Sequence, residues 1–423
     1  MNPNPRRRLG WKILSGVLLG AVATVGGMVV RVQLVATAAE AEWTRRMREL
    51  ESELGPGDHR RRAVRGAPLP GNGWDDYLGA VADLQKLPDS ELKITVLRQV
   101  SPGQEDWDAL QEFEEKYPEI LDRAWKGTRR EVCRHPEFDR NRIGTPARFP
   151  EIRLHQIPRL ASARGRLLQT RAQAHDAAAH WLDLAVFGQD LCGNPAGMGW
   201  STGFEVFERA LAGVKDLIAS PAVRPEDLSE LARGLAMLEE TYPSEGRTLR
   251  AYQFYRGSIL PEEELLLGAD CVKRTPGIQD TWRFGLSEKL MLFRGLQEMD
   301  RWIERCRAID EMPFADVKAL HATMVNERAT GNPVVATFCP DLLSWTNAWR
   351  VPRAHLRLLR AAAHYRATGE VPDLADPFGA RLGQSRTGST LRLWSVGRDG
   401  EDHRGQGEWT DAPGRDIVLE VDR

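Results

Sequence analysis

A long uncharged stretch near the N-terminus limits what this chain can fold into more than any other feature. Residues 13–30, ILSGVLLGAVATVGGMVV, carry no charged side chain. As a helix they would extend about 27 Å, close to the thickness of the hydrocarbon layer of a bilayer. A basic cluster precedes the stretch and consists of Arg6, Arg7, Arg8 and Lys12. Because basic flanks stay in the cytoplasm, we predict a single-pass anchor in a bacterial inner membrane, with residues 32–423 in the periplasm.

The main alternative for this stretch is a cleaved signal peptide, since the ATA at residues 36–38 resembles a signal-peptidase site. The stretch is longer than the apolar region of a usual signal peptide, and Arg31 separates it from that site, which favours an anchor. Within it, Gly16 and Gly20 form a GxxxG pair, which lets two helices approach closely in lipid. The pair predicts a homodimer through the anchor, although glycine is also common in membrane helices generally.

The composition excludes several other classes of protein. Hydrophobic residues make up 42% of the chain, which is typical of a globular protein and not of a polytopic membrane protein or a disordered one. The formal net charge is −2, so no overall field attracts nucleic acid. The five cysteines show no CxxC spacing, which argues against a zinc site or a thioredoxin-like motif.

Hydrophobic periodicity predicts a mainly helical chain. Trp74, Tyr77, Val81 and Leu84 recur at steps of three and four residues, as on one face of a helix. Residues 225–243 open with a proline followed by acidic residues, which is typical of a helix start. We predict five regions: a cytoplasmic tail (1–8), a transmembrane anchor (9–31), a charged stalk helix and linker (32–73), an α-helical array or bundle (74–352), and a helix with a small β cap (353–423).

The pattern changes near residue 370. In DPFG, residues 376–379, proline is second and glycine fourth after a leading aspartate, which favours a type I turn. Leu391, Leu393 and residues 416–421 then predict two short strands on either side of an acidic, glycine-rich loop. The chain therefore ends in a small β structure next to its last helix.

One segment matches a catalytic motif in its letters. GWSTG, residues 199–203, has the GxSxG form in which Ser201 would be the nucleophile of a serine hydrolase. That chemistry requires a buried strand before the serine, and the preceding FGQDLCGNPAGMG does not have the pattern of a strand. A local explanation is that Thr202 caps the next helix, with Glu205 completing a capping box. The hydrolase is the alternative to a protein without catalytic activity.

The histidines do not form a recognisable site. His175 and His180 are five residues apart, which places them on different faces of a helix, and no HExxH occurs. His355 and His364 share one predicted helix but lie more than two turns apart. We interpret all four as partly exposed helix residues.

The closing loop is rich in carboxylates. Aspartates and glutamates supply several oxygens within a short segment, and glycines allow carbonyl groups to turn inward, a composition that suits calcium. Arginines and a histidine in the same loop oppose a cation unless they point outward. The other interpretation is a solvated hairpin loop held by turns and Arg–Asp pairs.

The tail, residues 361–418, resembles the C-terminal part of the major pseudopilin of type II secretion systems. The matching residues are Tyr365, Gly369 and Pro372 of YRATGEVP, Asp376, Pro377, Phe378 and Gly379 of the turn, Ser395, Gly397, Asp399 and Gly400 of the loop, and Asp416 with Ile417 at the end. In that family the loop binds a structural calcium. The resemblance implies calcium ligands at Asp399 and Asp416, with Asp402 and Asp411 as further candidates.

The chain differs from a pseudopilin elsewhere. It has no peptidase-processed segment of the GFTLxE type, and the matching block lies far from the predicted anchor. As a whole it resembles bacterial single-anchor envelope proteins of unassigned function that have a helical body and this tail. We therefore expect a non-enzymatic scaffold or interaction protein of the cell envelope, linked to a secretion or pilus-like assembly and binding another envelope protein.

Overall fold

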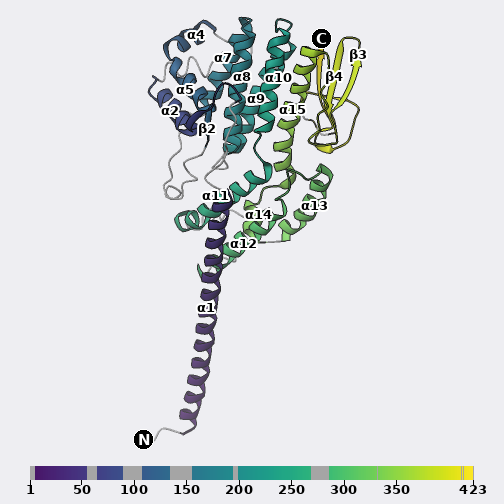
Figure 1. Cartoon of the computed structure of the whole chain (residues 1–423). Coiled ribbons are helices and arrows are strands. Elements are labelled where there is room, and N and C mark those ends of the chain that lie inside the picture. Colours follow the sequence, from purple (N-terminus) through teal and green to yellow (C-terminus); the bar gives the residue numbers. More distant parts are fainter. Residues whose placement is uncertain are drawn as a thin grey trace. The chain divides into compact units, whose positions relative to one another are not determined.

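The computed structural model has a mainly helical chain with a few short strands (Figure 1). It describes residues 5–54, 64–88, 107–133, 155–193, 199–267, 285–330, 332–410, 412 and 414–422. These residues form two compact units. Unit 1 comprises Met1–Glu53, Arg256–Glu304 and Asn326–Cys339, and unit 2 comprises Leu54–Tyr255, Arg305–Val325 and Pro340–Arg423. The domain boundary predicted after residue 352 lies inside a single helix, α15 (Leu342–Thr368).

The N-terminal helix α1 runs without interruption from Pro5 to Leu54. Across the part of the chain whose side chains are described, no helix is both long enough and apolar enough to cross a membrane. The predicted span at residues 13–30 is therefore not confirmed. Its first part, up to residue 22 and including Gly16 and Gly20, lies outside the described side chains.

The second half of α1 is amphipathic and packs into unit 1. Ala36, Ala39, Trp43, Met47 and Leu50 recur at steps of three and four residues and are all buried. The Trp43 indole donates a hydrogen bond of 3.2 Å to a backbone carbonyl of α11 (Glu245–Leu267). This part of the predicted stalk is thus a packed helix with one apolar face. The other helices of unit 1 are α12 (Gly285–Arg305) and α14 (Pro333–Phe338).

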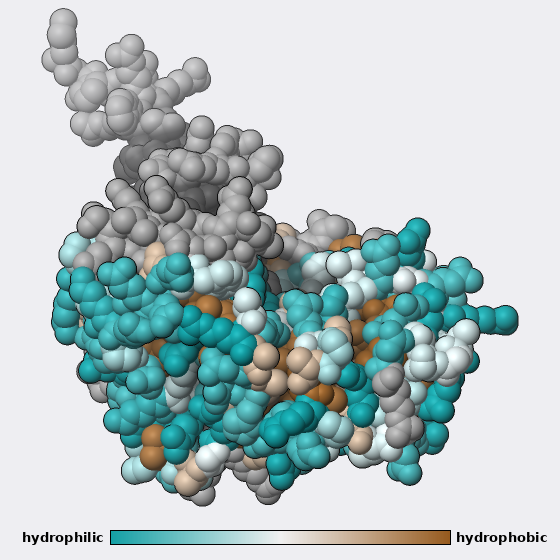
Figure 2. Space-filling view, turned by 90° about the horizontal axis from the view of Figure 1, so that it is seen from above, coloured by the Kyte–Doolittle hydropathy of each residue, from teal (hydrophilic) through white to brown (hydrophobic). Residues whose placement is uncertain are grey.

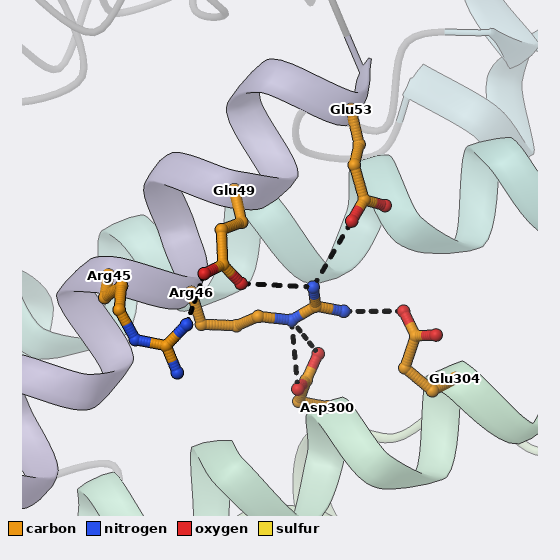
Figure 3. A network of polar contacts seen from close by, with 6 residues as sticks. All are labelled: Arg45, Arg46, Glu49, Glu53, Asp300 and Glu304. Carbon is orange, nitrogen blue, oxygen red and sulfur yellow. Dashed lines mark hydrogen bonds and ion pairs between the residues drawn. The ribbon is translucent and has the colours of Figure 1, made fainter.

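An arginine joins α1 to α12 (Figure 3). The Arg46 guanidinium donates to both oxygens of Asp300, at 2.9 and 3.1 Å, and to Glu304 at 2.6 Å. It also contacts Glu49 and Glu53 of its own helix. Its side chain is only 18% exposed, so these charge-assisted bonds are shielded from water and stronger than surface ion pairs.

Unit 2 is a bundle of helices around α8, which is buried along most of its length. Its helices are α2 (Gly73–Gln85), α4 (Trp107–Lys116), α5 (Pro118–Thr128), α7 (Gln156–Thr170), α8 (Ala174–Cys192), α9 (Gly199–Ala219), α10 (Pro225–Glu240) and α15, together with the first parts of α11 and α13 (Phe314–Thr330). Two glycines let α8 and α9 approach closely, because a Cβ atom on Gly203 would collide with backbone atoms of Gly188 and Cys192. The apolar face predicted for α2 and the proline-led start predicted for α10 are confirmed.

Two short strands lie where helices and a linker are predicted. Strand β1 (Leu69–Asn72) pairs in parallel with β2 (Arg130–Val132) at the edge of the bundle. The last part of the region predicted as stalk and linker (32–73) thus contains strand β1, while residues 55–63 lie outside the described chain. The pairing joins segments about sixty residues apart, which no local pattern reveals.

The small β structure at the C-terminus is confirmed and is larger than predicted. Its four strands have the order β3-β4-β6-β5, with β3 at Gly383–Thr387, β4 at Thr390–Ser395, β5 at Gly407–Glu408 and β6 at Asp416–Asp422. Strands β4 and β6 pair antiparallel and place Leu391, Leu393, Ile417, Leu419 and Val421 in the core that includes α15.

One face of the molecule is mostly hydrophilic, with hydrophobic residues in small separate areas (Figure 2).

Candidate functional site

The carboxylates predicted to bind calcium accept hydrogen bonds from the loop itself. Asp416 is buried and accepts backbone N–H groups of His403 and Gly405, at 3.2 and 2.6 Å. Asp402 accepts the Trp394 indole N–H at 3.0 Å. No group of three metal-ligating side chains occurs among the residues that the structure describes, and Asp411 lies outside them.

Asp399 has a different partner. Its carboxylate accepts the backbone N–H of Glu401 at 2.9 Å and lies 2.9 Å from the His403 ring. The hydrogen bond with this carboxylate raises the pKa of His403. The carboxylates of the loop therefore accept hydrogen bonds from the protein's own N–H groups. Calcium binding in the loop stays a prediction of the pseudopilin resemblance.

The turn before the sheet is anchored by a buried carboxylate. Asp376 closes the predicted turn, since its carbonyl accepts the N–H of Gly379 at 3.3 Å. Its side chain accepts the N–H groups of Phe378 and Val396 and the Ser395 hydroxyl, at 2.7 to 3.0 Å. Burial raises the pKa of Asp376 despite these three donors. This residue therefore fastens the turn to the end of β4.

The serine of GWSTG is part of a helix. Helix α9 begins at Gly199, so Ser201 lies in its first turn, and the cap predicted at Thr202 with Glu205 is wrong because both residues are inside the helix. The preceding described element is α8, and residues 194–198 between them lie outside the described chain. Gly203 contacts α8 as described above, so the glycine of this segment has a packing role. The geometry does not support the strand–turn–helix arrangement that a serine hydrolase requires.

Two of the four histidines are buried, which corrects the prediction that all are partly exposed. His180 packs inside the bundle, and burial lowers its pKa to about 3 while its Nε2 lies 2.6 Å from the carbonyl oxygen of Ala161. His355 contacts the Glu208 carboxylate through Nδ1 at 2.8 Å and donates from Nε2 to the Trp409 carbonyl at 2.8 Å. Its ring also stacks on Trp409 with centroids 4.2 Å apart. These contacts fix the closing loop against α15.

A pocket in unit 2 was missed by the sequence reasoning. It has a volume of about 420 Å³ and lies between the start of α11, the start of α13, and α15. Its wall includes Tyr242 and Trp349, which meet edge to face, and Phe314 and Phe378, which do the same at 4.9 Å. The polar side chains of the wall are Glu245, Asp310, Glu311, Arg350, Arg353, Arg357 and Asp376.

Glu245 is the unusual group of this pocket. It is the first residue of α11 and is only 4% exposed, and its carboxyl group lies beside the buried Thr346 hydroxyl. Burial raises its pKa to about 7, against the opposing charge of Arg350, whose Nε lies 4.0 Å away. Asp310 meanwhile accepts the N–H groups of Glu245 and Gly246, at 2.7 and 3.0 Å, and so caps this helix.

Arg350 holds the pocket together. Its guanidinium donates to the carbonyl oxygens of Ile309, Met312 and Pro377, at 2.8 to 3.0 Å. It therefore fastens the segment before α13 and the turn before the sheet to α15. The nearby Arg353 guanidinium lies 5.9 Å from the centre of the Tyr242 ring.

Among the described residues of the pocket's lining there is no serine, threonine, cysteine, histidine or lysine, and Glu245 is placed to exchange a proton near neutral pH. No local signal marks Glu245 in the sequence, because the groups that bury and surround it come from residues 310–315 and 349–357.

Comparisons of the chain with protein-family models, with curated proteins and with solved structures found no match.

Proposed function

We propose that the chain is a non-enzymatic, membrane-anchored interaction protein of the bacterial cell envelope. The observation that carries the proposal is the distribution of exposed apolar side chains. Six of the seven large hydrophobic residues exposed in the described part of the chain lie on α1, between residues 25 and 35. They are Val25, Met28, Val29, Val30, Leu34 and Val35, with exposed fractions from 37% to 66%.

Val25, Met28, Val29 and Val30 lie within the predicted anchor, and Leu34 and Val35 follow just beyond Arg31. Exposed apolar residues on several sides of a helix favour an environment that surrounds it. Covering each such side chain is worth about 1.5–3 kcal/mol, so an uncovered segment of this kind is unfavourable in water. Lipid provides this cover on every side, and the basic residues that precede residue 13 favour a cytoplasmic N-terminus. The bulk of the chain would then lie in the periplasm.

The connection between anchor and body supports a structural role. Helix α1 continues without a break from the apolar segment to the part where its buried face and Arg46 bind it to α11 and α12 of unit 1. The anchor is therefore continuous with a folded unit and is not attached through a flexible linker. The pseudopilin-like tail favours a partner within a secretion or pilus-like assembly of the envelope.

Membrane extraction tests the anchor. The full chain should stay in the membrane fraction after an alkaline carbonate wash. A Val25→Asp/Val29→Asp variant should be released, because an ionised carboxylate is costly in hydrocarbon. Thr37→Asp, a substitution just beyond the apolar segment, is the matched control and should remain bound.

Topology is tested separately. A reporter that is active only in the cytoplasm should be silent when fused after Arg423. Release of the unmodified chain by carbonate, or strong activity of this reporter, would contradict the proposal.

A further inference from the structure

The C-terminal sheet has one edge that is only partly covered. Strand β5 pairs with β6 at two positions, Gly407 with Asp416 and Glu408 with Ile417. Beyond Ile417, β6 continues to Asp422, and no other described strand pairs with it on this side. An uncovered edge of this kind is a template for another extended chain.

The cause of the gap is the path of the chain after Glu408. The next residue, Trp409, leaves the sheet, because its ring stacks on His355 and its carbonyl accepts the His355 Nε2–H. A continued β5 would need that carbonyl group and its neighbours for the ladder with β6. The contact with α15 therefore keeps the edge open.

The pairing of β5 with β6 shows which backbone groups of β6 face the open edge. The backbone N–H of Asp416 donates to the carbonyl of Gln406, so the backbone N–H of Asp416 points toward the β5 side. Backbone direction alternates along a strand, so Glu420 and Asp422 direct their N–H groups to the same side. The carbonyl groups of Val418 and Glu420 point there as well. Residues 418–421 span roughly 10 Å of this edge.

A hollow of about 440 Å³ lies beside this edge. Its far wall is the end of α9, which contributes Lys215, Ile218 and Ala219, and its near wall is β6. The Lys215 ammonium lies 5.3 Å from the centre of the Trp409 ring. The other cation of the hollow, the Arg392 guanidinium on the near wall, forms an ion pair with Glu420 at 3.1 Å.

We propose that an extended peptide segment of a partner protein adds to the β6 edge as a further strand and places an acidic side chain near Lys215. The proposal rests on the proposed function and names the kind of partner that an interaction protein of this form would take. Backbone hydrogen bonds supply affinity in such strand addition, and the walls of the groove supply specificity.

A second copy of this chain is a poorer occupant. Antiparallel pairing of two β6 edges centred on Glu420 would set like charges opposite each other, which is unfavourable. A second copy would also bring its whole sheet beside the wall that the end of α9 forms. A single extended segment avoids the like charges and requires less space.

The test uses the detergent-solubilised full chain and a panel of capped hexapeptides with alternating apolar residues and a terminal aspartate. Bound peptide should slow amide hydrogen exchange at Glu420 and Asp422. Glu420→Pro removes the outward N–H while leaving the ladder with β4, and it should weaken binding at least tenfold. Glu420→Gln, which keeps the N–H, should bind within twofold of the unchanged protein.

Two further measurements separate strand addition from other kinds of binding. Methylation of alternate peptide nitrogens should abolish binding to the unchanged protein, which keeps the test valid if Glu420→Pro folds poorly. Lys215→Gln should weaken binding of the aspartate peptides about threefold or more and should not affect binding of the same peptides made with asparagine in place of aspartate.

Equal binding to Glu420→Pro, protection of other amides only, absence of binding across the panel, or dimerisation through this edge would each overturn the proposal. The proposed function fails separately, since membrane extraction and topology do not depend on this edge.

Discussion

Replacing Glu245 with an uncharged residue should make the protein more stable at high pH and leave its stability near pH 4.5 unchanged. Its pKa is raised in the folded state to about 7 from a usual value of 4.5. The folded state therefore holds this proton more tightly than the unfolded chain does. The tightly held proton therefore adds to the free energy of unfolding. This contribution is fully present below about pH 4.5 and is lost as the pH rises through about 7.

The size of the effect follows from the same shift. A difference of one pKa unit corresponds to 1.36 kcal/mol, so the rise to about 7 represents about 3 kcal/mol. The side chain is only 5% exposed, so solvent screening removes little of this. Glu245→Gln keeps the size of the group and removes the charge. We expect the variant to match the unchanged protein near pH 4.5 and to exceed its stability by about 3 kcal/mol at pH 8.

Urea unfolding followed by tryptophan fluorescence at pH 5 and pH 8 measures this difference. Glu401→Gln, on the exposed surface of the closing loop, is the matched control for loss of a carboxylate elsewhere. The control distinguishes titration of Glu245 from a general effect of pH on the protein. A stability difference between Glu245→Gln and the unchanged protein that stays constant within about 1 kcal/mol across this range would contradict a raised pKa of Glu245.

Three other predictions concern α1, the closing loop and Ser201. Arg46→Met should weaken the attachment of α1 to α12 by about 2 kcal/mol, which lowers hydrogen-exchange protection of residues 43–50 roughly 30-fold. Arg46→Lys should have an intermediate effect. Unchanged protection would count against the network. If Asp399 and Asp416 share calcium, chelator should lower the melting temperature and Asp416→Asn should remove that response; an unchanged melting curve supports the loop's own hydrogen bonds instead. A serine-reactive probe should not label the chain at Ser201, since the serine lies within α9, and labelling that Ser201→Ala abolishes would favour the hydrolase.

Elements with a strong local pattern were predictable from the sequence. The face of α2 and the start of α10 follow from periodicity and from proline at the first helical position, and both depend only on neighbouring residues. The strands β4 and β6 were also predictable, because apolar residues alternate or cluster on each side of a glycine-rich loop. The turn at Asp376 follows from its own residues in the same way.

The features that join distant segments depend on the packing of the whole chain. Strand β1 finds its partner only when residue 130 is brought beside residue 69, and Trp43 is buried only when α11 packs against α1. The carboxylates of the predicted metal ligands were visible in the sequence, but only the fold brings backbone N–H groups to donate hydrogen bonds to Asp416. The raised pKa of Glu245 likewise depends on the fold. A glutamate at a helix start is ordinary in sequence, and its pKa near 7 arises because folding removes water from around it.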